Sequence, residues 1–211
     1  MPPARLARWL DRWAEAHAPV ALTVVGEREV VFVGAEGARV VCDPPFPPLA
    51  DAVGELDGYR PGPLLAHVER ERIVGVLLVR LGGHAAGVFE GERLAASKVG
   101  SRLVHGRHRK GGSSSGRFAR RRAGQARVAL QAAADVAARV LLPWEGRLEA
   151  LVLGGDRRAL DEVLDDQRLQ PLRPLLAGRV FDVPDPRLNV LRAMPERFTA
   201  TVVRPSGTII A

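Results

Sequence analysis

The residues best suited to chemistry lie in one run, VHGRHRKGGSSSGRFARRR, at positions 104–122. Gly111 and Gly112 allow backbone turns closed to other residues and a close approach to a partner. The serines at 113–115 are small, and one of them can cap a following helix, whose free N–H groups favour an anion. We expect a loop that reaches into a narrow RNA-walled cavity while neighbouring arginines hold phosphates. The alternative is a basic loop that binds RNA without chemistry.

Basic residues are concentrated around this run. The chain has 31 basic and 24 acidic residues and a net charge of +7, but residues 101–134 hold nine basic side chains and no acid, so the remainder has a net charge of −2. Such clustering is typical of a phosphate-rich partner, either a nucleic acid or an anionic membrane. The nine residues are Arg102, Arg107, Arg109, Lys110, Arg117, Arg120, Arg121, Arg122 and Arg127.

Missing motifs exclude several other kinds of site. The chain has no phosphate-binding P-loop, no dinucleotide fingerprint and no G-x-S-x-G nucleophile elbow. His105 and His108 are close in sequence but lie among arginines that would repel a cation, so we expect no metal site and no cofactor. The apolar strand expected at 72–80 offers no carboxylates for a two-metal nuclease. A single cysteine, Cys42, excludes a disulfide framework, and no apolar run reaches the ~20 residues of a membrane span.

The elements that must position the loop follow an α/β order. Apolar runs predict a three-strand meander before the loop, and an alanine-rich stretch predicts a long helix after it. Two further helix and strand alternations follow, which predicts an α/β fold with a mixed sheet and flanking helices. The expected strands are 72–80, 85–90, 92–97, 148–153, 179–183 and 199–203, and the expected helices are 117–142 and 157–166, the latter capped by Asp156.

A small N-terminal α+β region is expected at residues 1–65. An apolar stripe at helical spacing predicts a helix over 4–17. Two β-branched runs, 21–25 and 29–33, predict a hairpin, with a third strand over 39–42. The proline-rich stretch after residue 43 is typical of a linker. We therefore place a domain boundary near residue 65, with a second domain over 66–211.

The run HGRHRKGGSSSGRFARRR resembles the glycine-glycine-glutamine loop in the middle domain of eukaryotic and archaeal peptide chain release factors. Gly111 and Gly112 match its two glycines, and the RFAR run at 117–120 matches the start of the helix that follows. The order of elements agrees from about Arg70 to the C-terminus. The chain also resembles the release-factor-like group that includes eukaryotic peptidyl-tRNA hydrolases of ribosome-associated quality control and their actinobacterial relatives. This resemblance implies a release-factor middle-domain fold with RNase H-like topology.

The resemblance also implies an activity, cleavage of the ester between a nascent chain and tRNA. Its catalytic tip would be Gly111, Gly112, Ser113 and Ser114. In the relatives a glutamine positions water and its backbone N–H helps to hold the oxyanion. Here serines occupy the corresponding positions and keep the N–H, with a shorter side chain. The implied RNA-binding residues are Arg102, Arg107, His108, Arg109, Lys110, Arg117, Arg120, Arg121 and Arg127.

We therefore predict a ribosome-associated, codon-independent peptidyl-tRNA hydrolase that rescues stalled large subunits. Region 1–65 is too short for both a codon-reading and a partner-binding domain, which favours rescue over termination. The expected partners are the large ribosomal subunit, rRNA and peptidyl-tRNA, for a cytoplasmic monomer without a membrane partner. One alternative is a non-catalytic RNA-binding factor, favoured by the missing glutamine. Another is a tRNA 3′-end nuclease with His105 or His108 as base.

Overall fold

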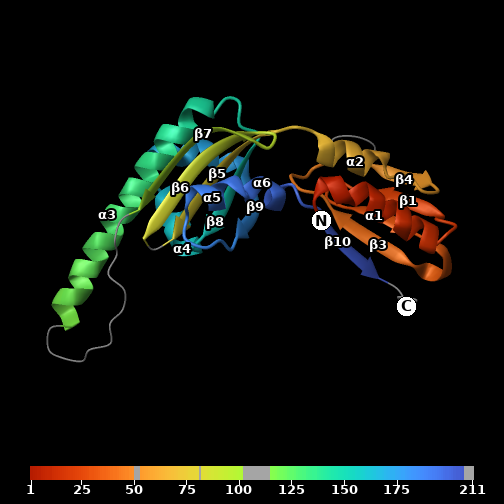
Figure 1. Ribbon diagram of the computed structural model, residues 1–211, viewed down its shortest axis with the longest axis horizontal. Coiled ribbons are helices and arrows are strands. Elements are labelled where there is room, and N and C mark those ends of the chain that lie inside the picture. The colour runs from red at the N-terminus through yellow and green to blue at the C-terminus, as the bar shows by residue number, and fades with distance from the viewer. Residues whose placement is uncertain (50–52, 81, 102–114, 207–211) are drawn as a thin grey trace. The chain divides into compact units, whose positions relative to one another are not determined.

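A computed structural model describes residues 1–49, 53–80, 82–101 and 115–206, with only the backbone described over 115–123 (Figure 1). These residues form two compact units. Unit 1 comprises Met1–Glu71 and the described residues from Glu196 on, and unit 2 comprises Arg72–Pro195. Each unit has its own five-stranded sheet and its own apolar cluster. The expected mixed α/β fold with flanking helices is confirmed.

Unit 1 is an antiparallel sheet with helices on one face. Its strands run in the order β10-β3-β2-β1-β4. The stripe predicted for the first helix is confirmed, because Leu6, Leu10 and Trp13 of α1 are buried against alternate residues of the sheet. The elements are α1 (Pro3–Ala16), β1 (Leu22–Val25), β2 (Val30–Val33), η1 (Ala35–Gly37), β3 (Arg39–Asp43), β4 (Gly54–Asp57), α2 (Gly62–Glu69) and β10 (Val202–Ser206).

Unit 2 is a mixed sheet covered by helices. Its strand order is β7-β6-β5-β8-β9, antiparallel from β7 to β5 and parallel from β5 to β9. The strands β5 and β8 are buried almost throughout, as their apolar runs predict. The elements are β5 (Ile73–Arg80), β6 (Gly83–Glu90), β7 (Arg93–Ser101), α3 (Ser115–Leu141), η2 (Leu142–Trp144), β8 (Ala150–Gly155), α4 (Arg157–Leu164), η3 (Gln167–Leu175), β9 (Leu176–Phe181) and α5 (Leu188–Arg192). The short helix α6 (Met194–Phe198) crosses from unit 2 into unit 1.

The proline-rich stretch expected as a linker is part of unit 1. It carries β4, which pairs with β1, and it leads into α2, so the expected boundary near residue 65 lies inside a helix. The physical reason is a long-range contact. The Thr23 hydroxyl donates to the carbonyl of Gly58 at 2.7 Å and accepts from the N–H of Arg60 at 3.0 Å, which fixes this stretch to the sheet.

The last strand also differs from the expected division at 66–211. In sequence β10 follows the elements of unit 2, but it pairs with β3 of unit 1 (Figure 1). Its Val203 packs on the unit 1 cluster, and Arg204 binds Asp43 across the pair. The chain therefore leaves unit 1 after Glu71 and returns to it at Glu196.

Candidate functional site

Most of the predicted site residues lie outside the described residues. These are Arg102, Arg107, His108, Arg109, Lys110, Gly111, Gly112, Ser113 and Ser114, together with His105. Arg117, Arg120 and Arg121 lie on α3, and the structure gives their place on the helix but not their side chains. Arg127 is described in full and is exposed on α3. The structure therefore shows the two elements that carry the loop, β7 before it and α3 after it.

The end of β7 is held by a close contact with β6. Ser101, the last residue of β7, pairs with Gly83, and Gly100 pairs with His84. The His84 side chain is buried, and a Cβ atom built on Gly100 would lie 2.3 Å from its Nε2 atom. A side chain at position 100 would have to displace this buried imidazole, so the glycine lets β7 pack closely on His84 just before the chain enters the loop.

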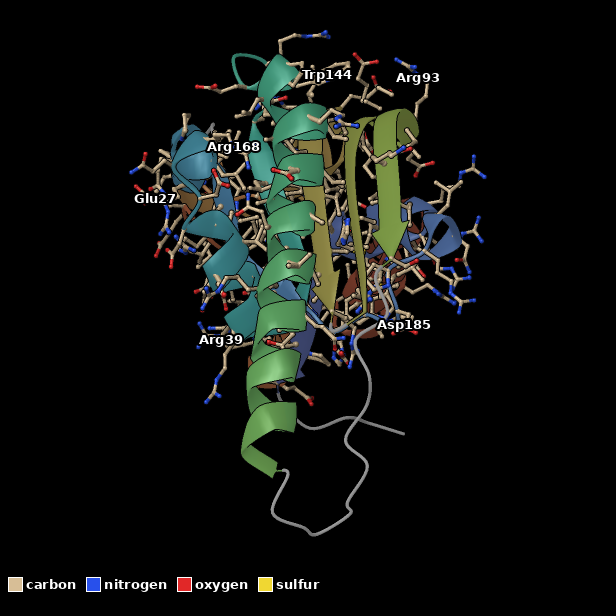
Figure 2. All side chains as sticks on the ribbon, turned by 90° about the vertical axis from the view of Figure 1, so that its left-hand side faces the viewer. Glu27, Arg39, Arg93, Trp144, Arg168 and Asp185 are labelled. Carbon is tan, nitrogen blue, oxygen red and sulfur yellow. The ribbon has the colours of Figure 1, made fainter. Side chains whose placement is uncertain are left out.

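Helix α3 is bound to the sheet along its C-terminal half. Leu130, Ala133, Ala137 and Leu141 recur at spacings of three and four and pack in the unit 2 cluster. With 27 residues the helix is about 40 Å long, at 1.5 Å per residue. Figures 1 and 2 show its N-terminal part extending beyond the ends of the strands. The N-terminal end of α3, at Ser115, thus lies beyond the strands of unit 2.

A polar clamp fixes the middle of α3. Arg168 of η3, labelled in Figure 2, donates to Asp135 of α3 at 2.7 Å. Its Nε and Nη2 atoms donate to Asp166 at 2.9 and 2.7 Å. Gln131, one turn before Asp135, donates to Asp166 at 3.4 Å. The hydrogen bonds from Arg168 lower the pKa of Asp166 to about 2. The clamp therefore joins α3 to the segment after α4.

The clamp also affects the electrostatics of the helix. Asp135 is the first acidic residue after the nine basic residues of 101–134. Its carboxylate shares Arg168 with Asp166, which lowers the pKa of Asp135 and leaves the three side chains with a net charge of −1. The basic residues therefore lie on the N-terminal part of α3, and the negative charge of the clamp lies at the middle of the helix. This arrangement suits a surface that binds phosphate.

A cavity of about 310 Å³ lies between α3, α4 and the end of β5. Its apolar wall comes from α3, including Ala129, Leu130 and Ala133, and its charged residues are of both signs. Asp156 is occupied as the N-cap of α4, as predicted, because its carboxylate accepts from the N–H of Ala159 at 3.0 Å. Since basic and acidic side chains balance, this cavity does not select an anion.

Within the described part of the chain, no group of three or more histidine, cysteine or acidic residues is arranged to hold a metal ion. No helix formed by described residues is long and apolar enough to cross a membrane.

The region that contains these strands and α3 matches a known protein family. A family described as the actinobacteria/chloroflexi VLRF1 release factor matches residues 72–204, more than half of the chain. Peptide chain release factor subunit 1 of Archaeoglobus fulgidus is 26% identical over 122 residues, which cover 57% of this chain and 30% of that protein. The chain thus spans under a third of this curated relative.

Two solved structures are similar to the chain at low sequence identity. The archaeal translation termination factor aRF1 is 16% identical, with a TM-score of 0.43, over 93% of this chain and 73% of that one. Pelota of Archaeoglobus fulgidus is 12% identical, with a TM-score of 0.31, over 90% of this chain and 58% of that one. The family match covers the meander, the loop and α3, and on that basis the chain belongs to the actinobacteria/chloroflexi VLRF1 release factor family.

Proposed function

We propose that the protein is a codon-independent peptidyl-tRNA hydrolase that releases nascent chains from stalled large ribosomal subunits in the cytoplasm. The observation that carries this proposal is the junction between β7 and α3. A double-glycine loop with no acidic residue joins a fixed strand end to a long, basic helix, within the region that matches a release factor family. The helix and loop together would reach a site enclosed by RNA.

The basic residues would bind the phosphates of the large ribosomal subunit, and the length of α3 would decide which site on the subunit the loop can enter. Each phosphate contact made by an arginine or lysine releases counterions, so affinity for the subunit would fall steeply with salt. Arg127 lies on the exposed face of α3 and makes no ion pair with a described residue, so it is available to phosphate. The arginines at 117, 120 and 121 would continue this surface toward the loop.

The reaction would be attack by water on the ester carbonyl carbon. The bond from that carbon to the 3′ oxygen of the terminal adenosine breaks, and the 3′ oxygen takes up a proton, with the adenosine 2′-OH assisting. Backbone N–H groups at Gly111–Ser115 would stabilise the negative charge on the carbonyl oxygen. Ser113 or Ser114 would orient the water. No metal or cofactor takes part.

A second function, a non-catalytic RNA-binding factor of the large subunit, is favoured by one observation. Serine stands where the related release factors have glutamine, and its hydroxyl reaches less far. Such a factor would bind subunits through the same basic residues and leave peptidyl-tRNA whole.

The test is single-turnover release of labelled peptide from purified large subunits that carry peptidyl-tRNA. Gly112→Val excludes every backbone conformation that only glycine can adopt, so it should stop release, while binding persists because the arginines remain. Ser113→Ala and Ser114→Ala should each cost less, since water can replace a hydroxyl. If Ser113→Ala alone abolished release and Gly112→Val did not, the backbone mechanism would be wrong.

A further inference from the structure

The sheet of unit 1 has one face that packs on helices and one that does not. Residues such as Phe32 and Val40 point to α1 and α2 and form the apolar cluster. On the opposite face, cross-strand pairing places five apolar side chains side by side on β1, β2 and β3. None of the five belongs to either apolar cluster of the described residues; Val31 in the middle is 8% exposed, and the other four are half-buried. We call this set the valine face: Leu22, Val24, Val31, Val33 and Val41.

Carboxylates border the valine face. On β4, Glu55 stands opposite Val24 and Asp57 stands opposite Leu22. Neither carboxylate makes an ion pair with a described residue. At a second border, Arg39 stands opposite Val33 and Arg204 stands opposite Val41. Arg204 binds Asp43 and lies 3.8 Å from Glu29, so basic and acidic side chains balance there, and the acidic border is the one along β4.

Charge distinguishes the two units. Residues 1–71 and 196–211 hold 9 basic and 12 acidic residues, a net charge of −3. Unit 2 holds the other 22 basic and 12 acidic residues, a net charge of +10. An acidic surface repels the phosphates of RNA and attracts lysine and arginine. Unit 1 is therefore suited to a protein partner, whereas the charge of unit 2 suits nucleic acid.

The dimensions of the valine face fit one α-helix. Neighbouring strands lie about 4.8 Å apart, so the axes of β1, β2 and β3 span about 10 Å. A helix with its side chains is about 10–12 Å wide. We propose that the valine face binds an amphipathic helix of a partner protein whose apolar stripe is bordered by lysines or arginines.

The test uses the full chain and a synthetic helical peptide with leucines at i, i+3, i+4 and i+7 and lysines on both flanks. A second peptide carries glutamates in place of the lysines. Calorimetry measures affinity, and methyl NMR signals of Val24, Val31 and Val41 locate the contact. Reversal of two charges, Glu55→Lys with Asp57→Lys, should weaken binding of the lysine peptide about tenfold or more, because it turns attraction into repulsion.

A matched control reverses two exposed charges away from the valine face, Glu69→Lys with Glu71→Lys, and should leave the affinity within about twofold. Val24→Thr with Val41→Thr keeps β-branched residues in the sheet and should also weaken binding. The proposal is overturned if the lysine peptide does not bind, if both peptides bind equally, or if the two charge reversals act alike. It is also overturned if the valine methyl signals stay unchanged, or if a second copy or an RNA oligonucleotide occupies the face.

Discussion

One residue inserted into α3 tests whether this helix is a rigid support for the loop. An alanine placed between Gly124 and Gln125 rotates everything N-terminal to it by 100° and moves it by about 1.5 Å. The insertion lies before Leu130, where packing on the sheet begins, so unit 2 should remain folded. A displacement of about 1 Å in a catalytic group can cost about 100-fold in rate. We expect peptide release to fall at least about 100-fold.

The control is Gly124→Ala, which adds the same side chain without rotation. A Cβ atom at Gly124 meets nothing within 4 Å, so this change should keep release intact and stabilise the helix by about 0.5–1 kcal/mol. Insertion of seven residues rotates the N-terminal part of α3 to within about 20° of two full turns. This insertion should restore the direction in which that part faces, while it lengthens the helix by about 10 Å. The assay is single-turnover release, with subunit binding measured in parallel. Release at the wild-type rate after the single insertion would refute the rigid support.

Three further predictions concern stability. Asp166→Asn removes a carboxylate whose pKa in the folded protein, about 2, lies below its ordinary value of 3.8. The wild type should therefore have a higher free energy of unfolding than the variant above about pH 4, and this difference should disappear as the pH falls from about 4 to 2, as measured by urea titrations. Burial and, after it, the charge of Asp43 raise the pKa of the Cys42 thiol to about 12. A thiol reagent at pH 8 should therefore label Cys42 only as fast as unit 1 unfolds locally. Fast labelling of the native protein would contradict this burial. Gly155 has a φ of +114°, and the Cβ atom of an alanine at this position would lie 2.0 Å from the carbonyl oxygen of Val79. Gly155→Ala should therefore lower the free energy of unfolding of unit 2 by at least about 3 kcal/mol, as measured by chemical denaturation.

Elements with a strong local pattern could be predicted from the sequence. The α1 stripe, the β1–β2 hairpin and the β5–β7 meander each depend on apolar spacing within one segment, and the structure has all three. The helix after the loop was expected from residue 117 and begins at Ser115. Local propensity is enough where one segment decides its own structure.

Elements that depend on distant partners could not be predicted. β4 lies in a proline-rich stretch whose pairing with β1 is fixed by Thr23, about thirty residues earlier in the chain. β10 returns to unit 1 through a pairing with β3 that no nearby residue indicates. The clamp at Arg168 could not be predicted for the same reason, because its partner Asp135 lies 33 residues away on another helix.

The candidate site was indicated by residue types rather than by periodicity. The double glycine, the serines and the uninterrupted basic charge are visible without a fold. What the structure adds is the support, namely Gly100 packed on His84 at the end of β7 and the clamped, sheet-bound half of α3. These contacts join residues that no sequence motif connects.

Analysis of both products of one reaction tests the central claim most directly. Wild-type protein is mixed with large subunits carrying peptidyl-tRNA labelled in the peptide and at the tRNA 3′ end. We predict free peptide with a terminal carboxylate and a tRNA with an intact CCA end, formed at the same rate. A shortened tRNA would show nuclease action, and peptidyl-tRNA left whole on subunits that bind the protein would show a binding factor; either result would contradict hydrolysis.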